Sequence, residues 1–575
     1  MAEVKVQNER VDDIPLLIGQ QQKMEMAEVI DTHINPHWRR QGLSVGQTIM
    51  AWLTFILSES DHRLSYVAPW VVTHLETLKR TLHPDLTEQD FNDDRLGDIL
   101  RYLSDDACWA AIEQELGRRT IRVYQLPQQI VRLDSTTVSL HHDPEGTELI
   151  RHGHSKDHRP DLAQLKVMLS SLDPMGAPLV TQIVAGSAAD DGLYTPAIDQ
   201  VRSVLEQRGL LYIGDSKMEA VSTRAHIVAG GDYYLTPLSH KGAQGELLTQ
   251  LVAMALAGEQ ELIDVFRQTE GEQAPELIAQ GYETSRQQEA MVAGERVVWT
   301  ERVLIVYSPN LAQSQYRGLQ GRLQRAEEKL LALTPPPGRG KRQHSDLPPL
   351  QAEVAAIMQK HGVTDLLHLT YERQAGQHQK RKYKDRPACV EETVRYQLHV
   401  QRNEEAIANE YRTRGWRLYV LTVPEDACSL AQAVQAYRGA PNIERDFSRL
   451  KGRPLGLRPV YVQREDHLKG LVRLLSLALR LLTLTEFVAR RALAAEDTGL
   501  AGLYPGNPKQ QTQRPTTERL LAAFANITLS LIQLPSQNIV HITPLSPLQC
   551  RILELLDLPT SIYSDLVVNV LPNPP

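Results

Sequence analysis

An acidic residue among basic ones marks the start of a predicted helix near residues 436–451. Tyr437, Glu444 and Lys451 are spaced seven residues apart, which is close to two helical turns. Pro441 is typical of a first helical turn, so we expect Glu444 and Lys451 on the helix and Tyr437 before it. A carboxylate flanked by cations suits metal-assisted chemistry on phosphate. These residues alone leave open an amphipathic surface helix with ordinary ion pairs.

Two further acids each follow a short apolar run that predicts a buried strand. Residues 130–133 lead to Asp134, and residues 210–214 lead to Asp215. The carboxyl ends of the strands in an open α/β sheet border the ligand crevice. We therefore expect both carboxylates to point into one site. Each Asp taken alone could instead cap the turn or helix that follows it.

Taken together, these residues resemble the DDE transposases of bacterial insertion sequences, in the group whose Glu lies in a signature of Tyr, Arg, Glu and Lys. In that signature two residues separate Tyr from Arg, three separate Arg from Glu, and six separate Glu from Lys. Tyr437, Glu444 and Lys451 fall in register, whereas Ala440 takes the Arg position and Arg438 lies two residues earlier.

The resemblance covers about residues 125–490, with a companion domain before it. Residues 152–161 resemble the segment that follows the first catalytic strand in one branch of these enzymes. Residues 216–218 depart from the pattern, because Ser, Lys and Met replace the Gly and aromatic residues often seen there.

The resemblance implies a ribonuclease H-like core with Asp134, Asp215 and Glu444 as catalytic residues. Converging carboxylates repel one another, and hard divalent cations relieve this repulsion through oxygen ligands, which indicates two Mg²⁺ or Mn²⁺ ions rather than zinc. Asp134 would bridge the ions, and the other two acids would each hold one. Such ions, about 3.5–4 Å apart, activate a water or a DNA 3′-hydroxyl and stabilise the leaving oxygen. The implied reaction is strand cleavage and strand transfer, by cut-and-paste through a DNA hairpin.

Two other functions fit the same residues. A catalytically inactive, transposase-derived regulator would bind terminal repeats without cleaving them, and the departures at Ala440 and at residues 216–217 favour it. A nuclease of the same fold would cut DNA without joining it. The presence of all three acids favours the active transposase.

The implied partner is double-stranded DNA, both the terminal inverted repeats and the target, bound by a homodimer. The candidate DNA-binding residues are Tyr437, Arg438, Lys451, Lys156, Arg159 and Trp299. Lys156 and Arg159 belong to a histidine-containing loop that we expect beside Asp134, where they could meet a phosphate, although turn structure also explains them. Trp299 could stack on a displaced base, but a Trp in a strand is more often a core residue.

Composition and charge limit the partners further. The formal net charge of −8 argues against a protein that coats DNA indiscriminately, so DNA affinity must come from local patches. Basic residues cluster at 438–458, 372–386 and 339–342, although each cluster could be a solvated loop. The chain shows no signal-peptide pattern and no apolar run of about 18 residues. We therefore expect a cytoplasmic, nucleoid-associated protein with no membrane span.

The order of predicted elements indicates an α/β fold, in which a ribonuclease H-like mixed sheet is interrupted by a β-containing insertion and preceded by an all-helical domain. Residues 1–120 form this helical domain, which either binds DNA ends or serves packing and dimerisation. Ser44 and Gln47 form a capping-box pattern there, and residues 87–90 begin a second helix. Residues 496–575 form a C-terminal tail, a dimerisation region or a cap on the core.

The catalytic core is predicted in two parts. Residues 125–236 form the first part and residues 426–495, with Glu444, the second. The gap between Asp215 and Glu444 is too long for a loop, so residues 237–425 must be an inserted domain. The predicted strands of the first part lie near 129–134, 164–172, 179–185, 210–215 and 232–235, with helices near 196–207 and after Asp215.

Overall fold

The computed structural model describes residues 4–37, 40–267, 274–338, 343–380, 389–439, 441–534 and 537–568. The chain forms two compact units. The first unit combines Met1–Thr236, Gln288–Trp299 and Ala436–Pro575, and the second combines Pro237–Gln287 and Thr300–Gln435. The predicted insertion, residues 237–425, falls mostly in the second unit, and the five predicted domain boundaries stay predictions.

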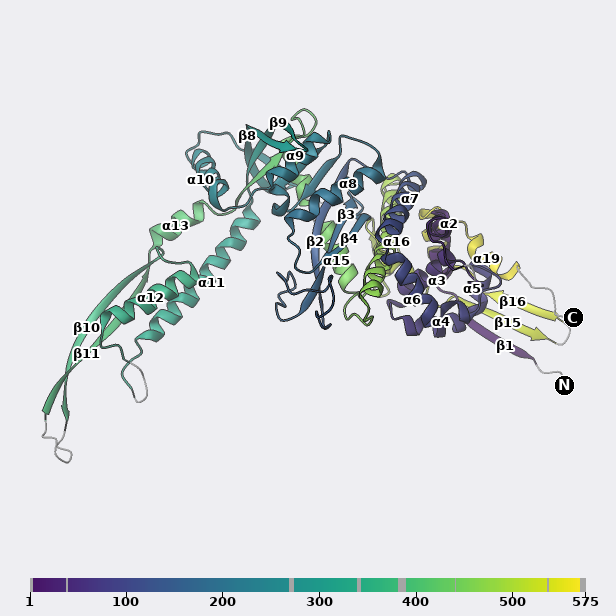
Figure 1. Cartoon of the computed structure of the whole chain (residues 1–575), viewed down its shortest axis with the longest axis horizontal. Coiled ribbons are helices and arrows are strands. Elements are labelled where there is room, and N and C mark those ends of the chain that lie inside the picture. Colours follow the sequence, from purple (N-terminus) through teal and green to yellow (C-terminus); the bar gives the residue numbers. More distant parts are fainter. Residues whose placement is uncertain are drawn as a thin grey trace. The chain divides into compact units, whose positions relative to one another are not determined.

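The first unit contains five neighbouring strands of a mixed sheet, of which β2, β3 and β4 are labelled in Figure 1. Its strands follow the order β4-β3-β2-β5-β6, where β2 pairs antiparallel with β3 and parallel with β5. β3 also pairs antiparallel with β4, and β5 pairs parallel with β6. These elements confirm the five predicted strands, and their bounds are Ile130–Leu140 (β2), Ala163–Leu172 (β3), Ala177–Ala185 (β4), Leu211–Gly214 (β5) and Tyr233–Pro237 (β6).

Helices connect and cover this sheet. α8 (Tyr194–Leu205) leads from β4 to β5, and α9 (Val221–Ala229) leads from β5 to β6, as predicted. α8 buries Ile198, Val201 and Leu205 on one face. α16 (Glu465–Ala495) is buried over most of its length and contacts β4, which confirms that the apolar run near residues 471–484 is a buried helix.

The N-terminal region is mainly helical, with α1 (Ile14–Lys23), α2 (Met26–His33), α3 (Val45–Glu59), α4 (Val67–Thr73), α5 (Leu75–Thr81), α6 (Asp93–Ser104) and α7 (Asp106–Tyr124). Ser44 and Gln47 form the predicted capping box of α3. The helix predicted after Thr87 is broken, because Glu88–Phe91 forms a 3₁₀ helix and Asn92 caps α6 separately.

The prediction of an all-helical N-terminal domain is wrong at β1 (Lys5–Arg10). This strand pairs antiparallel with β15 (Thr528–Leu534), which also pairs with β16 (Gln537–Ile542). β1 is mostly exposed, so its sequence carries little of the apolar alternation that marks a half-buried strand. Its partner lies more than 500 residues further along the chain, beyond the reach of any local pattern.

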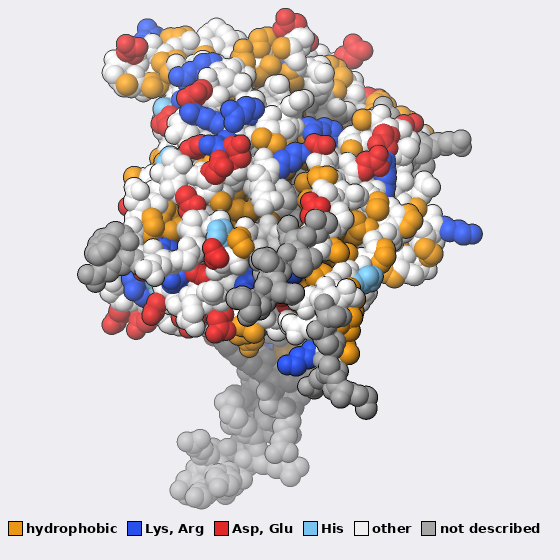
Figure 2. All heavy atoms as spheres, turned by 90° about the vertical axis from the view of Figure 1, so that its right-hand side faces the viewer, with side chains coloured by type: hydrophobic (Ala, Val, Ile, Leu, Met, Phe, Trp, Pro, Cys, Tyr) orange, Lys and Arg blue, Asp and Glu red, His pale blue; other side chains and the backbone are white. Residues whose placement is uncertain are grey.

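The C-terminal region packs on these N-terminal helices, so it is not a detached tail. α19 (Ser561–Val568) contacts α1 and α5, and the Tyr563 hydroxyl donates to the backbone oxygen of Asp12 at 2.8 Å. α17 (Thr517–Ala522) and α18 (Pro547–Leu555) both contact α16. On the face of the molecule drawn in Figure 2, Lys and Arg side chains are interspersed with Asp and Glu side chains.

The second unit has a core of its own and contains most of four further strands. β12 (Trp416–Leu421), β9 (Glu295–Tyr307), β8 (Glu276–Val292) and β7 (Ile263–Arg267) are neighbours in this order. α10 (Gly242–Leu256), α11 (Pro309–Leu333), α12 (Leu347–His361) and α13 (Glu404–Arg412) accompany a long hairpin of β10 (Leu367–Lys380) and β11 (Cys389–Arg402). α11, α12 and the hairpin share one apolar cluster, which includes Leu323, Val354 and Leu398. Across the described ranges, no helix has both the length and the apolar character that crossing a membrane requires.

Candidate active site

Asp134 and Asp215 lie side by side in the first unit. β2 and β5 are adjacent parallel strands, and Leu133 on β2 pairs with Gly214 on β5. Asp134 follows Leu133 and Asp215 follows Gly214, so the two acids come at the same level of the strand pair. Their carboxylates are close enough for the charge of Asp215 to raise the pKa of Asp134. The parallel register therefore brings two of the three predicted acids together.

Asp134 is a desolvated carboxyl with two donors on one oxygen. Burial raises its pKa to about 6, the nearby charge of Lys156 opposes this rise, and the charge of Asp215 adds to it. The backbone nitrogen of Ser135 donates to Oδ1 at 2.7 Å, and Lys156 Nζ lies 3.5 Å from the same oxygen. Adding a proton to Asp134 is therefore easier than for an ordinary Asp.

Asp215 is held by a buried tyrosine and by the backbone. The Tyr194 hydroxyl donates to Oδ1 at 2.6 Å, and the backbone nitrogen of Lys217 donates to it at 2.9 Å. Asp215 thus caps the 3₁₀ helix Ser216–Glu219, as the capping alternative expected, and it also faces Asp134. Burial, followed by the charge of Asp215, raises the pKa of Tyr194 far above its usual value, so this hydroxyl stays a donor.

A further carboxylate, Asp190, lies beside this pair and was not predicted from the sequence. Lys166 Nζ on β3 binds its Oδ1 at 2.7 Å, and the Ser135 hydroxyl lies 3.4 Å from the same oxygen. Burial alone would raise the pKa of Asp190, but the Lys166 hydrogen bond and the charge of Lys156 bring it below its usual value. Asp190 lies in a Gly- and Asp-containing turn after β4, which is typical of an ordinary loop.

Glu444 is exposed on α15 (Pro441–Lys451), the helix that contacts β2 and α16. At the end of this helix, Lys451 Nζ donates to Thr136 Oγ1 on β2 at 2.9 Å and pairs with Asp157 at 2.9 Å. Among the residues that the structure describes, no three His, Cys, Asp or Glu side chains lie together in a way that could hold a metal ion. Glu444 is therefore not gathered with the Asp pair into one set of ligands, and its catalytic role stays a prediction.

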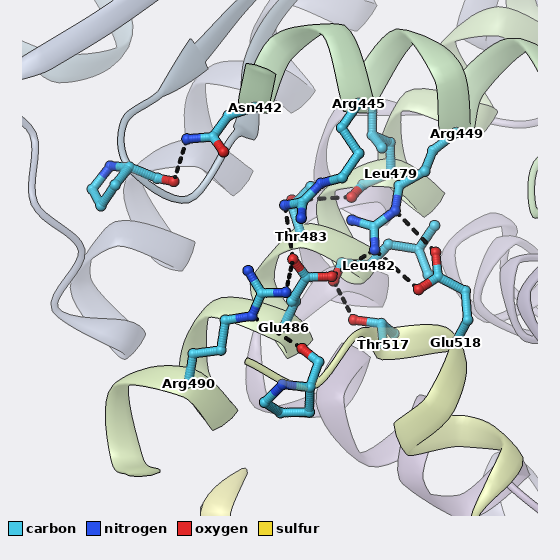
Figure 3. Close-up of polar contacts among 12 residues, drawn as sticks. Asn442, Arg445, Arg449, Leu479, Leu482, Thr483, Glu486, Arg490, Thr517 and Glu518 are labelled. Atoms are coloured by element: carbon cyan, nitrogen blue, oxygen red, sulfur yellow. Dashed lines mark hydrogen bonds and ion pairs between the residues drawn. The ribbon is translucent and has the colours of Figure 1, made fainter. Parts of the chain in front are cut away.

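Buried ion pairs fasten α15 to its neighbours (Figure 3). Glu486 on α16 pairs with Arg445 at 2.7 Å, with Arg449 at 2.5 Å and with Arg490 at 2.8 Å. Arg449 also forms two hydrogen bonds to Glu518 on α17, at 2.9 and 3.0 Å. We call these five residues the α15 clamp. Because Glu486 is only 2% exposed, its removal would take a buried acidic partner from three arginines at once.

Asp446, also on α15, is a buried acid beside the clamp. It is fully buried, and within the described residues neither of its carboxylate oxygens accepts a hydrogen bond. Burial raises its pKa to about 8, although the charges of Arg445 and Arg449 oppose the rise. Asp446 is therefore mostly protonated at neutral pH, and sequence reasoning did not single it out.

The predicted DNA-binding residues Lys451, Arg159 and Trp299 contact other residues of the chain in this structure. Lys451 is 14% exposed and bound to Asp157, and Arg159 pairs with Asp161 at 2.8 Å. Trp299 is buried and its Nε1 donates to the Tyr234 hydroxyl at 2.8 Å. The core alternative for Trp299 is what the structure shows, and its ring is not exposed for stacking on a base.

The other predicted DNA-binding residues and the basic clusters lie at several places in the structure. Tyr437 and Arg438 are half-buried at the end of α14 (Leu430–Arg438), and Lys156 lies beside Asp134 as expected. In the basic cluster 438–458, four cations are already in ion pairs, namely Arg445, Arg449, Lys451 and Arg458. Ala440, cluster 339–342 and most of the basic residues of cluster 372–386 lie outside the described residues.

The Asp pair fits a hard divalent cation. Both acids offer oxygen donors, which Mg²⁺ and Mn²⁺ prefer. They repel one another in a partly buried setting, and a cation between them would relieve that repulsion. Asp134 and Asp215 are therefore the residues of this site that would hold such an ion.

Residues 6–112 match the family described as Domain of unknown function (DUF4277). A comparison with curated proteins found no match. Among solved structures, the chain is similar to a piggyBac transposase synaptic complex with hairpin DNA, at 9% identity and a TM-score of 0.35, over 99% of this chain and 88% of that one. At this TM-score the likeness supports no conclusion about fold or activity.

Proposed function

We propose that the chain is a metal-dependent DNA transposase of the DDE kind, which cleaves a DNA strand and joins the freed 3′ end to target DNA. The observation that carries the proposal is the position of Asp134 and Asp215, at neighbouring places on two adjacent parallel strands. Asp134 lies within β2 and Asp215 directly follows β5, and two facing carboxylates suit divalent cations and phosphate chemistry.

The strand order supports a ribonuclease H-like core. Three consecutive antiparallel strands, β2 to β4, are followed by β5 and β6, which lie parallel to β2 on its other side. Helices α8 and α9 make the two crossovers. This arrangement is the one that the resemblance to DDE transposases implies, with Asp134 on β2 and Asp215 directly after the adjacent strand β5.

The chain's own residues would prepare the site. Tyr194 and the backbone nitrogen of Lys217 orient Asp215, and the backbone nitrogen of Ser135 orients Asp134. A bound Mg²⁺ or Mn²⁺ would polarise the phosphodiester and lower the pKa of an attacking water or hydroxyl. The α15 clamp holds the helix that carries Glu444, and we propose that Glu444 completes the site when DNA and two ions bind.

The same proposal includes the partners and the course of the reaction. Terminal inverted repeats and target DNA are the proposed substrates, a homodimer is the proposed active form, and a DNA hairpin is the proposed intermediate. These features follow from the resemblance of residues 437–451 and of Asp134 and Asp215 to the DDE group.

A transposase-derived regulator without catalytic activity is the second candidate. It is favoured by one observation, which is that Glu444 is not gathered with the Asp pair into a set of metal ligands within the described residues. Such a regulator would bind element ends and leave them intact.

Strand cleavage and joining test the proposal directly. Purified protein is incubated with Mg²⁺ and DNA that carries the inverted repeats flanking the gene. The transposase should cut and join, and Asp134→Asn, Asp215→Asn and Glu444→Gln should each abolish both products. Glu145→Gln, which alters an exposed acid in the loop after β2, is the matched control and should keep full activity. Binding without cleavage would support the regulator, and cleavage without joining would support a nuclease.

A further inference from the structure

Lys156 directs its ammonium at the acid pair from the loop between β2 and β3. Its Nζ lies 3.5 Å from Asp134 Oδ1. The same Nζ donates to the backbone oxygen of Ser135 at 2.6 Å and to Ser135 Oγ at 3.0 Å. A positive charge therefore already lies next to Asp134, where a metal ligand is proposed.

The protein fixes the loop that carries this lysine. The backbone nitrogen of Lys156 donates to Thr137 Oγ1 on β2 at 3.0 Å. The next residue, Asp157, pairs with Lys451 and with Arg458, each at 2.9 Å, and its side chain is only 10% exposed. The backbone of Lys156 is therefore held at its own nitrogen and by the ion pairs of the next residue. These contacts keep this part of the loop beside Asp134.

The two lysines of this cluster differ in their access to solvent. Lys166, the partner of Asp190, has a side chain that is 6% exposed, and its Nζ also donates to the backbone oxygen of Ala188. The Lys156 side chain is 30% exposed. Of the two lysines, Lys156 is therefore the one that can turn toward water, because it is partly exposed and has a flexible stem, whereas Lys166 is enclosed.

We propose that Lys156 holds the place of a divalent cation beside Asp134 and withdraws when one binds. This inference rests on the proposed function, because it concerns the same acid pair. In the absence of metal, Lys156 neutralises Asp134 and limits the repulsion between the two acids. Its presence also makes metal binding weaker than the acids alone would allow, so the free protein is kept in a low-affinity state.

Binding of Mn²⁺ to the DNA-free protein tests this role. The free Mn²⁺ is measured by electron paramagnetic resonance, with no reference to activity. Lys156→Ala and Lys156→Gln should each bind Mn²⁺ about tenfold more tightly than the natural chain, because one competing charge has been removed. Lys156→Arg should stay near the natural affinity. Arg151→Ala removes one positive charge from the same loop at an exposed position, and it should change the affinity less than twofold.

Thermal stability gives a second readout. Saturating Mn²⁺ should raise the melting temperature of Lys156→Gln more than that of the natural chain, because the tighter site stabilises the folded protein more at a given metal concentration. Asp134→Asn should abolish tight Mn²⁺ binding both in the natural chain and in the Lys156→Gln variant.

The outcomes separate the two proposals. If the natural chain binds Mn²⁺ through Asp134 and cleaves DNA, but the Lys156 variants bind Mn²⁺ no more tightly, the displacement role is overturned and the proposed function stands. If Mn²⁺ binding does not depend on Asp134 in any variant, both proposals are overturned. Tighter binding in both Lys156 variants, with unchanged binding in Arg151→Ala, supports the displacement.

Discussion

The two halves of the candidate site are held by different forces. Asp134 and Asp215 are placed by the backbone, through the parallel register of β2 and β5. Glu444 is placed by a helix whose position depends on side-chain charges, above all on Glu486 and the arginines around it. The first arrangement rests on the backbone hydrogen bonds of a strand ladder, whereas the second combines ion pairs around the buried Glu486 with the buried apolar side chains of Ile443, Phe447 and Leu450.

The two halves of the site should respond differently to the loss of a single side chain. A strand pair in the middle of a sheet tolerates the loss of a single side chain, because the backbone hydrogen bonds of β2 to β3 and to β5 remain. A helix fastened by a buried carboxylate does not, because a lost partner leaves an uncompensated charge. The Asp pair should therefore persist through most nearby substitutions, and the position of Glu444 should not.

The largest expected effect is the loss of DNA cleavage when one of the three acids is replaced, and Mn²⁺ binding should respond differently from cleavage. Asp134→Asn, Asp215→Asn and Glu444→Gln should each slow single-turnover cleavage by at least about 10³-fold. Only the two Asp variants should also lose Mn²⁺ binding in the DNA-free protein, because Glu444 is not gathered with them there. A Glu444→Gln protein that loses Mn²⁺ binding without DNA would show that the two halves form one site from the start.

The second largest effect is expected from replacing Glu486, the central acid of the α15 clamp. Glu486→Ala should destabilise the first unit by about 3–5 kcal/mol, because three arginines lose a buried partner. Hydrogen exchange should show α15 opening more often, with β2 and β5 still protected. Glu518→Ala is the matched comparison, since that side chain is 39% exposed and should have a much smaller effect. Equal effects of the two substitutions would refute the importance of burial in the clamp.

The buried acid on α15 should make stability depend on pH. The pKa of Asp446 is about 8 in the folded protein and about 3.9 in an unfolded chain. The unfolded chain therefore releases a proton between about pH 4 and 8 that the folded protein keeps, so stability falls as pH rises through this window. Asp446→Asn should become more stable than the natural chain as pH rises, by up to about 1.4 kcal/mol per pH unit. Urea unfolding at pH 5 and pH 8 measures this, and a difference that does not change with pH would rule it out.

A smaller effect is expected at the tyrosine that orients Asp215. Tyr194→Phe removes a 2.6 Å hydrogen bond to the carboxylate, while the bond from Lys217 remains. Cleavage should slow about tenfold, the scale of one hydrogen bond to a charged group. Tyr212→Phe is the matched control, because that buried hydroxyl has no hydrogen-bond partner among the described residues, and its rate should stay within about twofold. The orienting role fails if both variants react at the natural rate.

The half of the site that depends on the backbone could be predicted from the sequence. The apolar runs that lead to Asp134 and Asp215 indicate buried strands, and the sequence of elements along the chain indicates three adjacent strands followed by alternating helices and strands. β2 continues beyond Asp134 to Leu140, which the prediction missed because Ser135, Thr136 and Thr137 are polar and yet buried.

The half that depends on side-chain charges could not be predicted. Glu486 looks like one more charged residue on a long helix, and nothing near it in sequence shows that it meets Arg445 and Arg449. For the same reason the basic cluster around α15 was interpreted as a DNA-binding surface, although most of its cations pair with acids elsewhere in the chain. Lys166 and Tyr194 were missed because their partners, too, are distant in sequence.

The most direct test of the central claim is the position of Mn²⁺ in crystals of the protein bound to an element end. We predict anomalous scattering peaks within about 2.0–2.6 Å of carboxylate oxygens of Asp134 and Asp215, with Glu444 as a further ligand and Lys156 withdrawn from Asp134. Mn²⁺ bound elsewhere, with Lys156 still against Asp134 and Glu444 out of coordinating reach, would contradict the account.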